Sequence, residues 1–569
     1  MTEPMAGPLA EPVTGVVATG GHRTAALPAT GGRRRQWLGM VVISLGVSLI
    51  VVDATIVGVL LPGIVTELGL RATDAEWITS VYSLTFAALL ITCGRLADLA
   101  GRRRLFVLGT LVFVIASLAA AGSGSGPELI ASRLLQGVGA SMIMPATLST
   151  VNAVFTGRDR ALAFGIWGSL IAGMAAAGPL LGGWLATSHG WRWAFAVNLP
   201  IGAVIVVGAL CCVPETRADG AQGGAPERAP SGGERHGIDW VGAALSAVGL
   251  GAIVFALIEG QRYGWWAAVR PFTAGPIRLT DVSPVPVAAL GGVVAVCAFV
   301  LVERARSRAG RPVMLDLTLF RVPAFRIGSA AGALISVGEL GLLFVLPLFL
   351  QNVHGSSPLS ISAAIVPLAL GALCAGPFAG RLAGAYGAAR VVQFGMVLEV
   401  AAVLAIALTT RATTTGWGFA PWMLVYGIGL GLTSAQLTNV TLGGVPAADS
   451  GLAAGTQSTA RQLGAAVGIA LIGAVFTTTL GSAMLARTHD PAQARELRDS
   501  AGTYARTLRD APRLGSPTTA RAADESLAVA TSRAALTTTG ILALGLLMTL
   551  RLGRTAGRSA VAVRENLPS

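Results

Sequence analysis

Fourteen long apolar runs constrain what this chain can fold into more than any other feature of the sequence. A helix rises about 1.5 Å per residue, so about 20 apolar residues cross the ~30 Å hydrocarbon layer of a bilayer. In that layer every backbone polar group needs an internal partner, which a helix supplies. The sequence therefore predicts an all-α integral membrane protein with transmembrane helices at about residues 37–62, 75–97, 105–123, 128–152, 161–187, 192–213, 239–259, 286–303, 326–351, 359–380, 391–409, 420–443, 455–480 and 535–552.

The composition agrees with this class. Only 12% of the 569 residues are charged, about half the share in soluble domains. The net charge of +13 comes entirely from arginine. These arginines cluster in short segments between apolar runs, a pattern typical of cytoplasmic loops and not of a nucleic-acid interface. The five Cys residues lie in or beside apolar runs and show no disulfide or metal spacing.

The arginine pattern also predicts the orientation and the division of the chain. Arg102–Arg104 and the arginines between 304 and 311 mark cytoplasmic connections, because positive residues favour that side. An even number of spans then returns the C-terminus to the cytoplasm. The predicted parts are a disordered cytoplasmic tail (1–36), an N-terminal six-helix bundle (37–213), a cytoplasmic linker (214–238), two inserted transmembrane helices (239–303), a cytoplasmic connection (304–325), a C-terminal six-helix bundle (326–552) and a cytoplasmic tail (553–569).

The segment 481–534 does not follow this pattern of arginine-rich cytoplasmic connections. It is polar and contains eight Arg against six acidic residues, yet the span count places it outside the cell. Long segments translocate largely regardless of charge. The sequence therefore leaves two readings: a long external loop, in part helical, or a miscounted span.

An internal repeat relates the two bundles. GRLADLAGRRR at 94–104 returns as GRLAGAYGAAR at 380–390, and QGVGA at 136–140 has a counterpart in YGIGL at 426–430. These pairs fall at equivalent places in spans 1–6 and 9–14, so the two halves are predicted to be parallel repeats. Paired bundles with a binding site between them are the architecture of alternating-access carriers.

Four motifs, in order along the chain, resemble those of a known transporter family. The first is GRLADLAGRRR, the second surrounds Arg133 in span 4, the third is GPLLGG at 178–183, and the fourth is WRWAFAVNLPIG at 191–202. On these residues the chain resembles the major facilitator superfamily, and specifically its fourteen-span drug:proton antiporter branch. The resemblance implies two six-helix bundles plus two inserted helices, and transport by alternating access.

Two departures from the family pattern stand out. The first-span motif of the family usually reads Asp-x-Thr-Ile-Val-Asn, and this chain has Gly58 where the Asn would stand. The antiporter motif usually carries Gly four residues before its Gly-Pro, and this chain has Met174. The first removes a polar contact on the substrate side, and the second weakens the antiporter motif.

Asp53 is the first candidate functional residue, because a charge inside a spanning helix is costly and usually faces a cavity or a partner. It lies about 24 Å from Trp37 along the helix axis, at a depth comparable with that of Arg133 in span 4. The resemblance implies that Asp53 is the proton-coupling acid and that Arg133 tunes it. The alternatives are a structural acid satisfied by a neighbouring helix and an arginine paired with backbone carbonyls.

The second half offers candidates for a substrate cavity. Glu339 lies about 18 Å into span 9, near mid-bilayer, where it binds a cationic or polar substrate or a second proton, or serves as a structural acid. Glu399 in span 11 is interpreted as structural. Further cavity candidates are Gln436 and Asn439 on one face of span 12, Trp167 in span 5 and Phe344 in span 9.

The remaining motif residues are predicted to control conformation. By the resemblance, Gly94, Asp98, Gly101, Arg102 and Arg103 form a conformational latch at the cytoplasmic ends of spans 2 and 3. Gly178, Pro179, Gly182 and Gly183 form the antiporter hinge, because Pro removes a helix hydrogen bond and Gly permits close helix contact.

Together these features predict a multi-pass exporter in the bacterial cytoplasmic (inner) membrane, exchanging protons for an amphipathic organic molecule. No nucleotide-binding loop is visible in the sequence, so the proton gradient is the expected energy source. The expected partners are the lipid bilayer, protons and a small amphipathic substrate. The sequence predicts no cofactor, metal site, catalytic residue, nucleic-acid partner or obligate protein partner. Open alternatives are a dedicated exporter of one endogenous metabolite, a non-transporting receptor on the same fold and, more distantly, a membrane enzyme.

Overall fold

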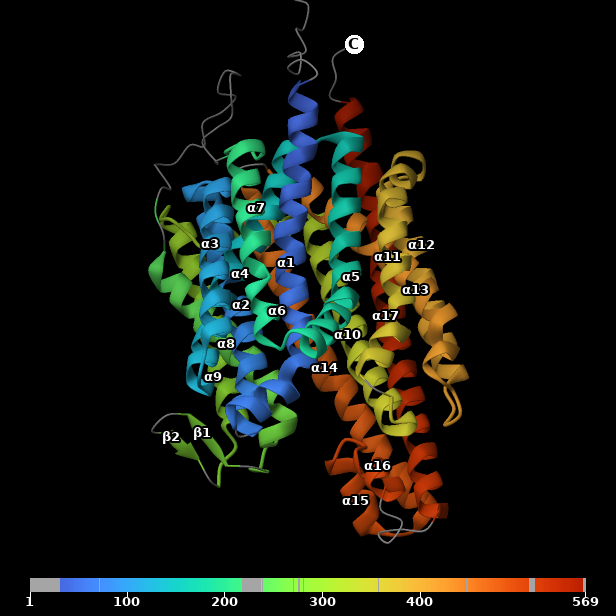
Figure 1. Cartoon of the computed structure of the whole chain (residues 1–569). Coiled ribbons are helices and arrows are strands. Elements are labelled where there is room, and N and C mark those ends of the chain that lie inside the picture. The colour runs from blue at the N-terminus through green and yellow to red at the C-terminus, as the bar shows by residue number, and fades with distance from the viewer. Residues whose placement is uncertain are drawn as a thin grey trace, which may run out of the picture.

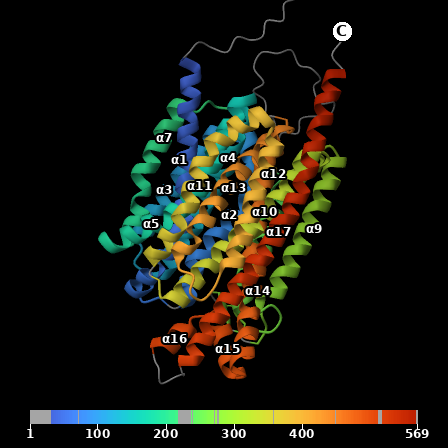
Figure 2. The ribbon, with the colours of Figure 1, turned by 90° about the vertical axis from the view of Figure 1, so that its right-hand side faces the viewer.

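Long helices running side by side make up almost the whole molecule (Figure 1). The computed structural model describes residues 31–70, 72–216, 237, 239–269, 271–274, 277–279, 281–356, 358–446, 449–510 and 517–565. The first helix begins and the last helix ends on the same side of the bundle, at the top of Figures 1 and 2. We call this the terminal side, and its reverse the far side.

The N-terminal half consists of six long helices or helix pairs. Its members are α1 (Gly31–Leu68), α2 (Ala72–Ala100), α3 (Arg102–Gly122), α4 (Gly126–Val154), α5 (Gly157–Ser188), and the short α6 (Arg192–Ala196) followed by α7 (Asn198–Cys212). Helix α4 packs on α2 and α3, while α1 packs on α5 and α7. The α6–α7 pair covers the single predicted span at 192–213.

The C-terminal half repeats this layout. It contains α10 (Pro323–His354), α11 (Pro358–Tyr386), α12 (Ala388–Thr409), α13 (Gly416–Gly443), α14 (Ser450–Thr488) and α17 (Pro517–Glu565). The sequence repeat has a structural counterpart, because Gly101 (φ 104°) separates α2 from α3 and Gly387 (φ 89°) separates α11 from α12. At positive φ a side chain is strained, so glycine at the same offset of both repeats makes the same sharp turn.

Two further helices stand between the halves in the chain. They are α8 (Trp240–Tyr263) and α9 (Pro284–Arg308), joined on the far side by a small hairpin of β1 (Phe272–Ala274) and β2 (Ile277–Leu279). The hairpin is antiparallel and pairs Phe272 with Leu279. Helix α8 packs against α9, α2 and α14, so the inserted pair lies along one side of the bundle. A short 3-10 helix, Leu317–Arg321, leads into α10.

Each of the fourteen predicted spans overlaps a helix of the described structure, but not every one of these helices is long and apolar enough to count as a membrane span. Twelve helices are long and apolar enough to cross a membrane, and α5 makes a thirteenth if its two bent parts count as one span. The remaining case, α13, has 28 residues and packs against α11, α12 and α5. Polar residues such as Gln436 therefore face protein instead of lipid.

The described part of segment 481–534 is mainly helical, as the first of the two readings allows. Helix α14 continues to Thr488, and α15 (Pro491–Asp499), α16 (Tyr504–Asp510) and the start of α17 follow. Leu497, Leu508 and Leu527 are buried among these helices. The result is a small helical cap on the far side, below the membrane-crossing part in Figure 1. Leu and Ala residues on one face of these helices supply the apolar contacts that hold the cap together.

Three predicted segments compare differently with the described structure. Helix α1 already begins at Gly31, inside the predicted tail 1–36, and residues 1–30 lie outside the described residues. Most of the predicted linker, 217–236 and 238, also lies outside them. The predicted tail 553–569 is helical as far as Glu565, because α17 continues without interruption.

Candidate functional site

Asp53 is completely buried in the N-terminal half and accepts hydrogen bonds from three side chains. The Arg133 guanidinium approaches Oδ2 at 2.5 Å. The Gln136 amide donates to Oδ1 at 2.9 Å, and Asn198 donates to the same atom at 3.2 Å. The structure thus brings together the two residues that the sequence paired, and it surrounds the charge with further donors.

The partners of Asp53 are themselves held in place. Arg133 also donates to the Ile78 carbonyl at 3.2 Å, and its guanidinium lies over the Tyr82 ring, 4.3 Å from the centroid. Gln136 and Asn198 both donate to the Ser117 hydroxyl. A buried ion pair is tolerable only when such additional hydrogen bonds satisfy its remaining polar atoms.

Gln136 and Asn198 have roles that the sequence analysis did not assign. Gln136 follows Arg133 by three residues, so both project from one face of α4. Asn198 begins α7 and belongs to the motif WRWAFAVNLPIG. The sequence contained a signal for Asn198, because an amide side chain within a membrane-spanning motif needs a hydrogen-bond partner.

A cavity of about 340 Å³ lies between the two halves. Its wall includes Ala54 and Thr55, the residues directly after Asp53, and the side chains of Trp167 and Glu339. The indole nitrogen of Trp167 is buried and has no hydrogen-bond partner among the described residues. The remaining wall is mostly apolar and includes Phe86, Met144, Leu148 and Ile171. An amphipathic molecule fits such a lining, because apolar surface carries most of the contact and a few polar groups orient it.

Glu339 has one ionic partner in the described structure. Its Oε2 lies 3.7 Å from an Arg461 nitrogen, and this oxygen makes no hydrogen bond to a described residue. Arg461 comes from α14 and also lines the cavity. Arg461 was not predicted as a site residue, although a lone arginine inside the predicted span 455–480 is a signal of the same kind as Asp53 and Glu339.

Three predicted cavity residues lie elsewhere. Of the described residues that line the cavity, α13 contributes Thr438 and neither Gln436 nor Asn439. Gln436 donates to the Ala161 carbonyl at 3.0 Å, and Asn439 accepts from Arg160 at 3.1 Å. Both therefore join α13 to α5 near the terminal side, because that face of α13 points to the other half. Phe344 is likewise outside the lining and is 39% exposed on the surface of α10.

The predicted latch closes the terminal side of the cavity. Asp98 pairs with Arg102 at 2.9 Å and accepts backbone hydrogen bonds from Gly451 at 2.9 Å and Leu452 at 2.8 Å. These two amides belong to the first turn of α14, where unsatisfied N–H groups and the helix dipole favour an anion. One carboxylate of the first half thus caps a helix of the second half.

Other latch residues support this contact. A Cβ atom added at Gly94 would lie 2.5 Å from the Gly451 carbonyl oxygen, so only glycine allows α2 and α14 to approach so closely. Arg103 lies at the edge, where its Nε is 3.7 Å from Glu215. Beyond Asp98, Asn152 donates to the Ser450 hydroxyl at 2.8 Å. The terminal side is therefore closed by hydrogen bonds between the two halves.

Comparison with known proteins identifies this architecture. The sequence profile described as Major Facilitator Superfamily matches residues 43–469, three quarters of the chain. The chain belongs to the major facilitator superfamily. It lies in the drug-efflux branch of this superfamily, as its relatives show.

Two curated relatives illustrate the branch. The tetracenomycin C resistance and export protein of Streptomyces glaucescens is 30% identical over 455 residues, which are 80% of this chain and 78% of the relative. The multidrug resistance protein Stp of Mycobacterium tuberculosis is 31% identical over 457 residues, covering 79% and 78% of the two chains. The human organic anion transporter MFSD10 (TETRAN) has a similar fold at 16% identity, with a TM-score of 0.56 over 92% of this chain and 100% of that chain.

The hinge motif of the superfamily brings α5 against α1 beside Asp53. A Cβ atom at Gly178 would lie 1.9 Å from the Thr55 hydroxyl, and one at Gly182 would lie 2.6 Å from Ile56. Helix α5 bends by 42° between Ala175 and Ala177. Pro179 accounts for the bend, because its ring displaces the carbonyl four residues earlier, that of Ala175. Gly183 continues the motif in the same turn.

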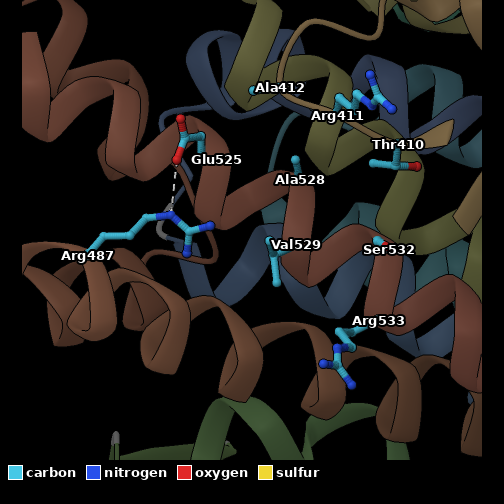
Figure 3. Close-up of a pocket in the computed structure, with 9 residues that line it drawn as sticks. All are labelled: Thr410, Arg411, Ala412, Arg487, Glu525, Ala528, Val529, Ser532 and Arg533. Atoms are coloured by element: carbon cyan, nitrogen blue, oxygen red, sulfur yellow. Dashed lines mark hydrogen bonds and ion pairs between the residues drawn. The ribbon is translucent and has the colours of Figure 1, made fainter. Parts of the chain in front are cut away.

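A second hollow shares no lining residue with the central cavity. Figure 3 shows its nine lining residues. The hollow measures about 450 Å³ and carries the arginines 411, 487 and 533. Arg487 pairs with Glu525 at 3.2 Å. The hollow is open at the surface, and its lining has more positive than negative side chains. It therefore differs from the enclosed, mostly apolar pockets that bind small molecules.

Proposed function

We propose that this protein exports amphipathic organic compounds in exchange for protons, by rocking its two halves about the central cavity. The terminal side is the cytoplasmic side, because the arginine-rich connections lie there. The membrane is the cytoplasmic membrane of a bacterium. The proton gradient drives the cycle without a cofactor, and the protein acts on its substrate by moving it and not by a chemical reaction.

One observation carries the proposal: a buried, fully hydrogen-bonded acid stands directly behind the wall of a cavity shared by both halves. Asp53 precedes the cavity residues Ala54 and Thr55, and Arg133 neutralises it at 2.5 Å. Protonation of Asp53 would leave Arg133 without its counter-ion, so the proton and the conformation of α1 and α4 are coupled. Burial makes that coupling strong, since an unpaired buried charge is costly.

The chemistry of the cavity indicates the substrate class. Apolar and aromatic side chains form most of the wall, while Glu339 and Trp167 provide an acceptor and a donor. Such a site suits molecules with a hydrophobic body and one cationic or polar group. The names of the relatives, an antibiotic exporter and a multidrug resistance protein, support the same class.

The test compares wild type with Asp53→Asn in a host that lacks its own drug pumps. We expect the wild type to protect cells from several amphipathic compounds and Asp53→Asn to abolish protection at equal protein levels. Asp499→Asn is the matched control, because Asp499 is 64% exposed in the far-side cap, and it should protect like the wild type. Protection that survives in Asp53→Asn would overturn the proposed role of Asp53.

A dedicated exporter of one endogenous antibiotic is the second candidate, since one relative is named as an export protein for a single compound. The same panel separates the two. Protection against one compound class alone would favour the dedicated exporter, and protection across unrelated amphipathic compounds would favour multidrug efflux.

A further inference from the structure

Glu399, on α12 of the second half, is a buried acid that the proposed mechanism does not use. Its side chain is completely inaccessible, and neither carboxyl oxygen makes a hydrogen bond of ordinary geometry to a described residue. Thr433 on the facing helix α13 interacts with it. A Cβ atom at Gly429 would lie 2.8 Å from Glu399 Cγ, so α12 and α13 clamp the side chain in one place.

The charged and titratable neighbours of Glu399 come from three helices. Helix α13 provides Tyr426, whose hydroxyl is buried and also has no hydrogen-bond partner among the described residues. Tyr426 lies in the field of both Glu339 and Glu399. Glu339 on α10 and Arg461 on α14 act electrostatically on Glu399. Helices α11 and α17 also pack on α12, and among the described residues neither places a charge on this carboxyl.

The burial of Glu399, with no hydrogen bond of ordinary geometry to a described residue, favours its neutral form in this conformation. An ionised carboxylate in an apolar interior is costly unless a counter-ion and hydrogen bonds compensate it. Asp53 has both, whereas Glu399 has no ion pair and no hydrogen bond of ordinary geometry to a described residue. The positive charge near Glu399, that of Arg461, is engaged by Glu339 at 3.7 Å. Glu399 therefore holds a proton, and the group Glu339, Arg461 and Glu399 is neutral as a whole.

We infer that Glu399 is a second proton site that empties when a cationic substrate binds at Glu339. This inference rests on the proposed export function and assigns to its cavity a preference for cations. The substrate cation takes the place of Arg461 at Glu339, and the freed charge of Arg461 then favours the ionised form of Glu399. The O–H bond of Glu399 breaks, its electron pair stays on the carboxylate, and water in the cavity takes up the proton. We assign the route to the side of Glu399 on which Tyr426 lies, in the field of both acids.

The charge balance explains why a proton must leave. Before binding, one carboxylate and one guanidinium cancel and Glu399 is neutral. After binding, the substrate and Arg461 carry two positive charges, which Glu339 and ionised Glu399 balance. Without ionisation of Glu399, the buried group would keep one uncompensated positive charge, which the membrane interior disfavours. When the substrate leaves, Arg461 returns to Glu339 and Glu399 takes up a proton again.

The experiment measures proton release by the purified full-length protein on binding of tetraphenylphosphonium, a lipophilic monocation. In weakly buffered solution with a pH indicator, Glu399→Gln should release about one proton fewer per bound cation than the wild type. By linkage, each pH unit should raise the tetraphenylphosphonium affinity of the wild type by a factor about ten times larger than that of Glu399→Gln, because one more proton is released on binding. Glu399→Asp keeps a titrating group and should restore both readings.

Several outcomes would overturn the inference. Equal proton release by Glu399→Gln and wild type would show that Glu399 keeps its charge state, and absence of tetraphenylphosphonium binding to the wild type would remove the cation site. If Glu399→Gln fails to fold, the test passes to Glu399→Asp and Tyr426→Phe. Tyr426→Phe should then slow proton release without changing its amount, and unchanged kinetics would contradict the route. The protection assay with Asp53→Asn tests the export function separately. If Asp53→Asn loses protection while Glu399→Gln releases as many protons as the wild type, the inference about Glu399 is rejected and the proposed function stands.

Discussion

The two halves of this protein arise from one repeat, yet they hold their central acids in opposite ways. Asp53 in the first half is fully buried and accepts from three donors at 2.5–3.2 Å. The Glu339 side chain in the second half is 12% exposed, and its one ionic partner among the described residues is Arg461 at 3.7 Å. The hydrogen-bonded ion pair of Asp53, the closed network, is costly to separate because it is fully buried. The partly exposed pair of Glu339 and Arg461, the loose pair, can separate at little cost. Under the proposed function, Asp53 is suited to proton coupling and Glu339 to contact with the substrate.

The largest expected effect concerns the closed network. Arg133→Gln would leave the Asp53 carboxylate buried without a counter-ion, and we expect it to destabilise the protein by about 3–5 kcal/mol. Removing both charges in Asp53→Asn/Arg133→Gln should recover most of that loss, because no unpaired charge then remains. Thermal unfolding of all four proteins in one detergent measures the cycle. Additive losses would contradict the closed network and weaken the contrast between the halves.

A second prediction tests the acid that joins the halves. Asp98→Asn removes a charge shared by Arg102 and the first turn of α14, so we expect the closed terminal side to lose about 1–3 kcal/mol. Spin labels at Arg104 and Arg390, one in each half, should report a larger open population in a cysteine-free background. Asp159→Asn, at the exposed pair with Arg33, is the control. An unchanged distance distribution would show that Asp98 does not hold the halves together.

The third prediction concerns the close packing that supports the Asp53 network. Gly178→Ala places a methyl group 1.9 Å from the Thr55 hydroxyl, so α5 must move away from α1 at a cost of about 1–3 kcal/mol. Gly58→Ala on α1 is the matched control, because nothing lies within 4 Å of its added Cβ. We expect only Gly178→Ala to lower the unfolding temperature. Equal behaviour of the two variants would contradict the tight α1–α5 contact.

The smallest stability effect is expected at the loose pair. Arg461 and Glu339 are 23% and 12% exposed, and a partly solvated pair at this distance contributes about 0–1 kcal/mol. Arg461→Gln should therefore shift the unfolding temperature much less than Arg133→Gln, while it changes the affinity for tetraphenylphosphonium severalfold. A stability loss as large as that of Arg133→Gln would show that the Glu339–Arg461 pair is held as tightly as the Asp53–Arg133 pair.

By itself, the sequence determined the membrane class, the helix positions and the two-fold repeat, because apolar length and glycine turns are local properties. It also identified Asp53 and Arg133, since charges at similar depth in apolar runs are rare and need each other. Two of the cavity candidates from the sequence, Trp167 and Glu339, do line the cavity.

Only the tertiary structure decided which side chains face one another. Position along a helix sets depth, but the direction of a side chain depends on how each helix is rotated against its neighbours. That rotation brings Asn198 to Asp53 and Arg461 to Glu339, turns Gln436 and Asn439 toward α5, and leaves Phe344 on the outer surface. It also encloses Glu399 between α12 and α13 with no hydrogen bond of ordinary geometry to a described residue, a state that no local pattern in the sequence can show, because it depends on all the surrounding helices.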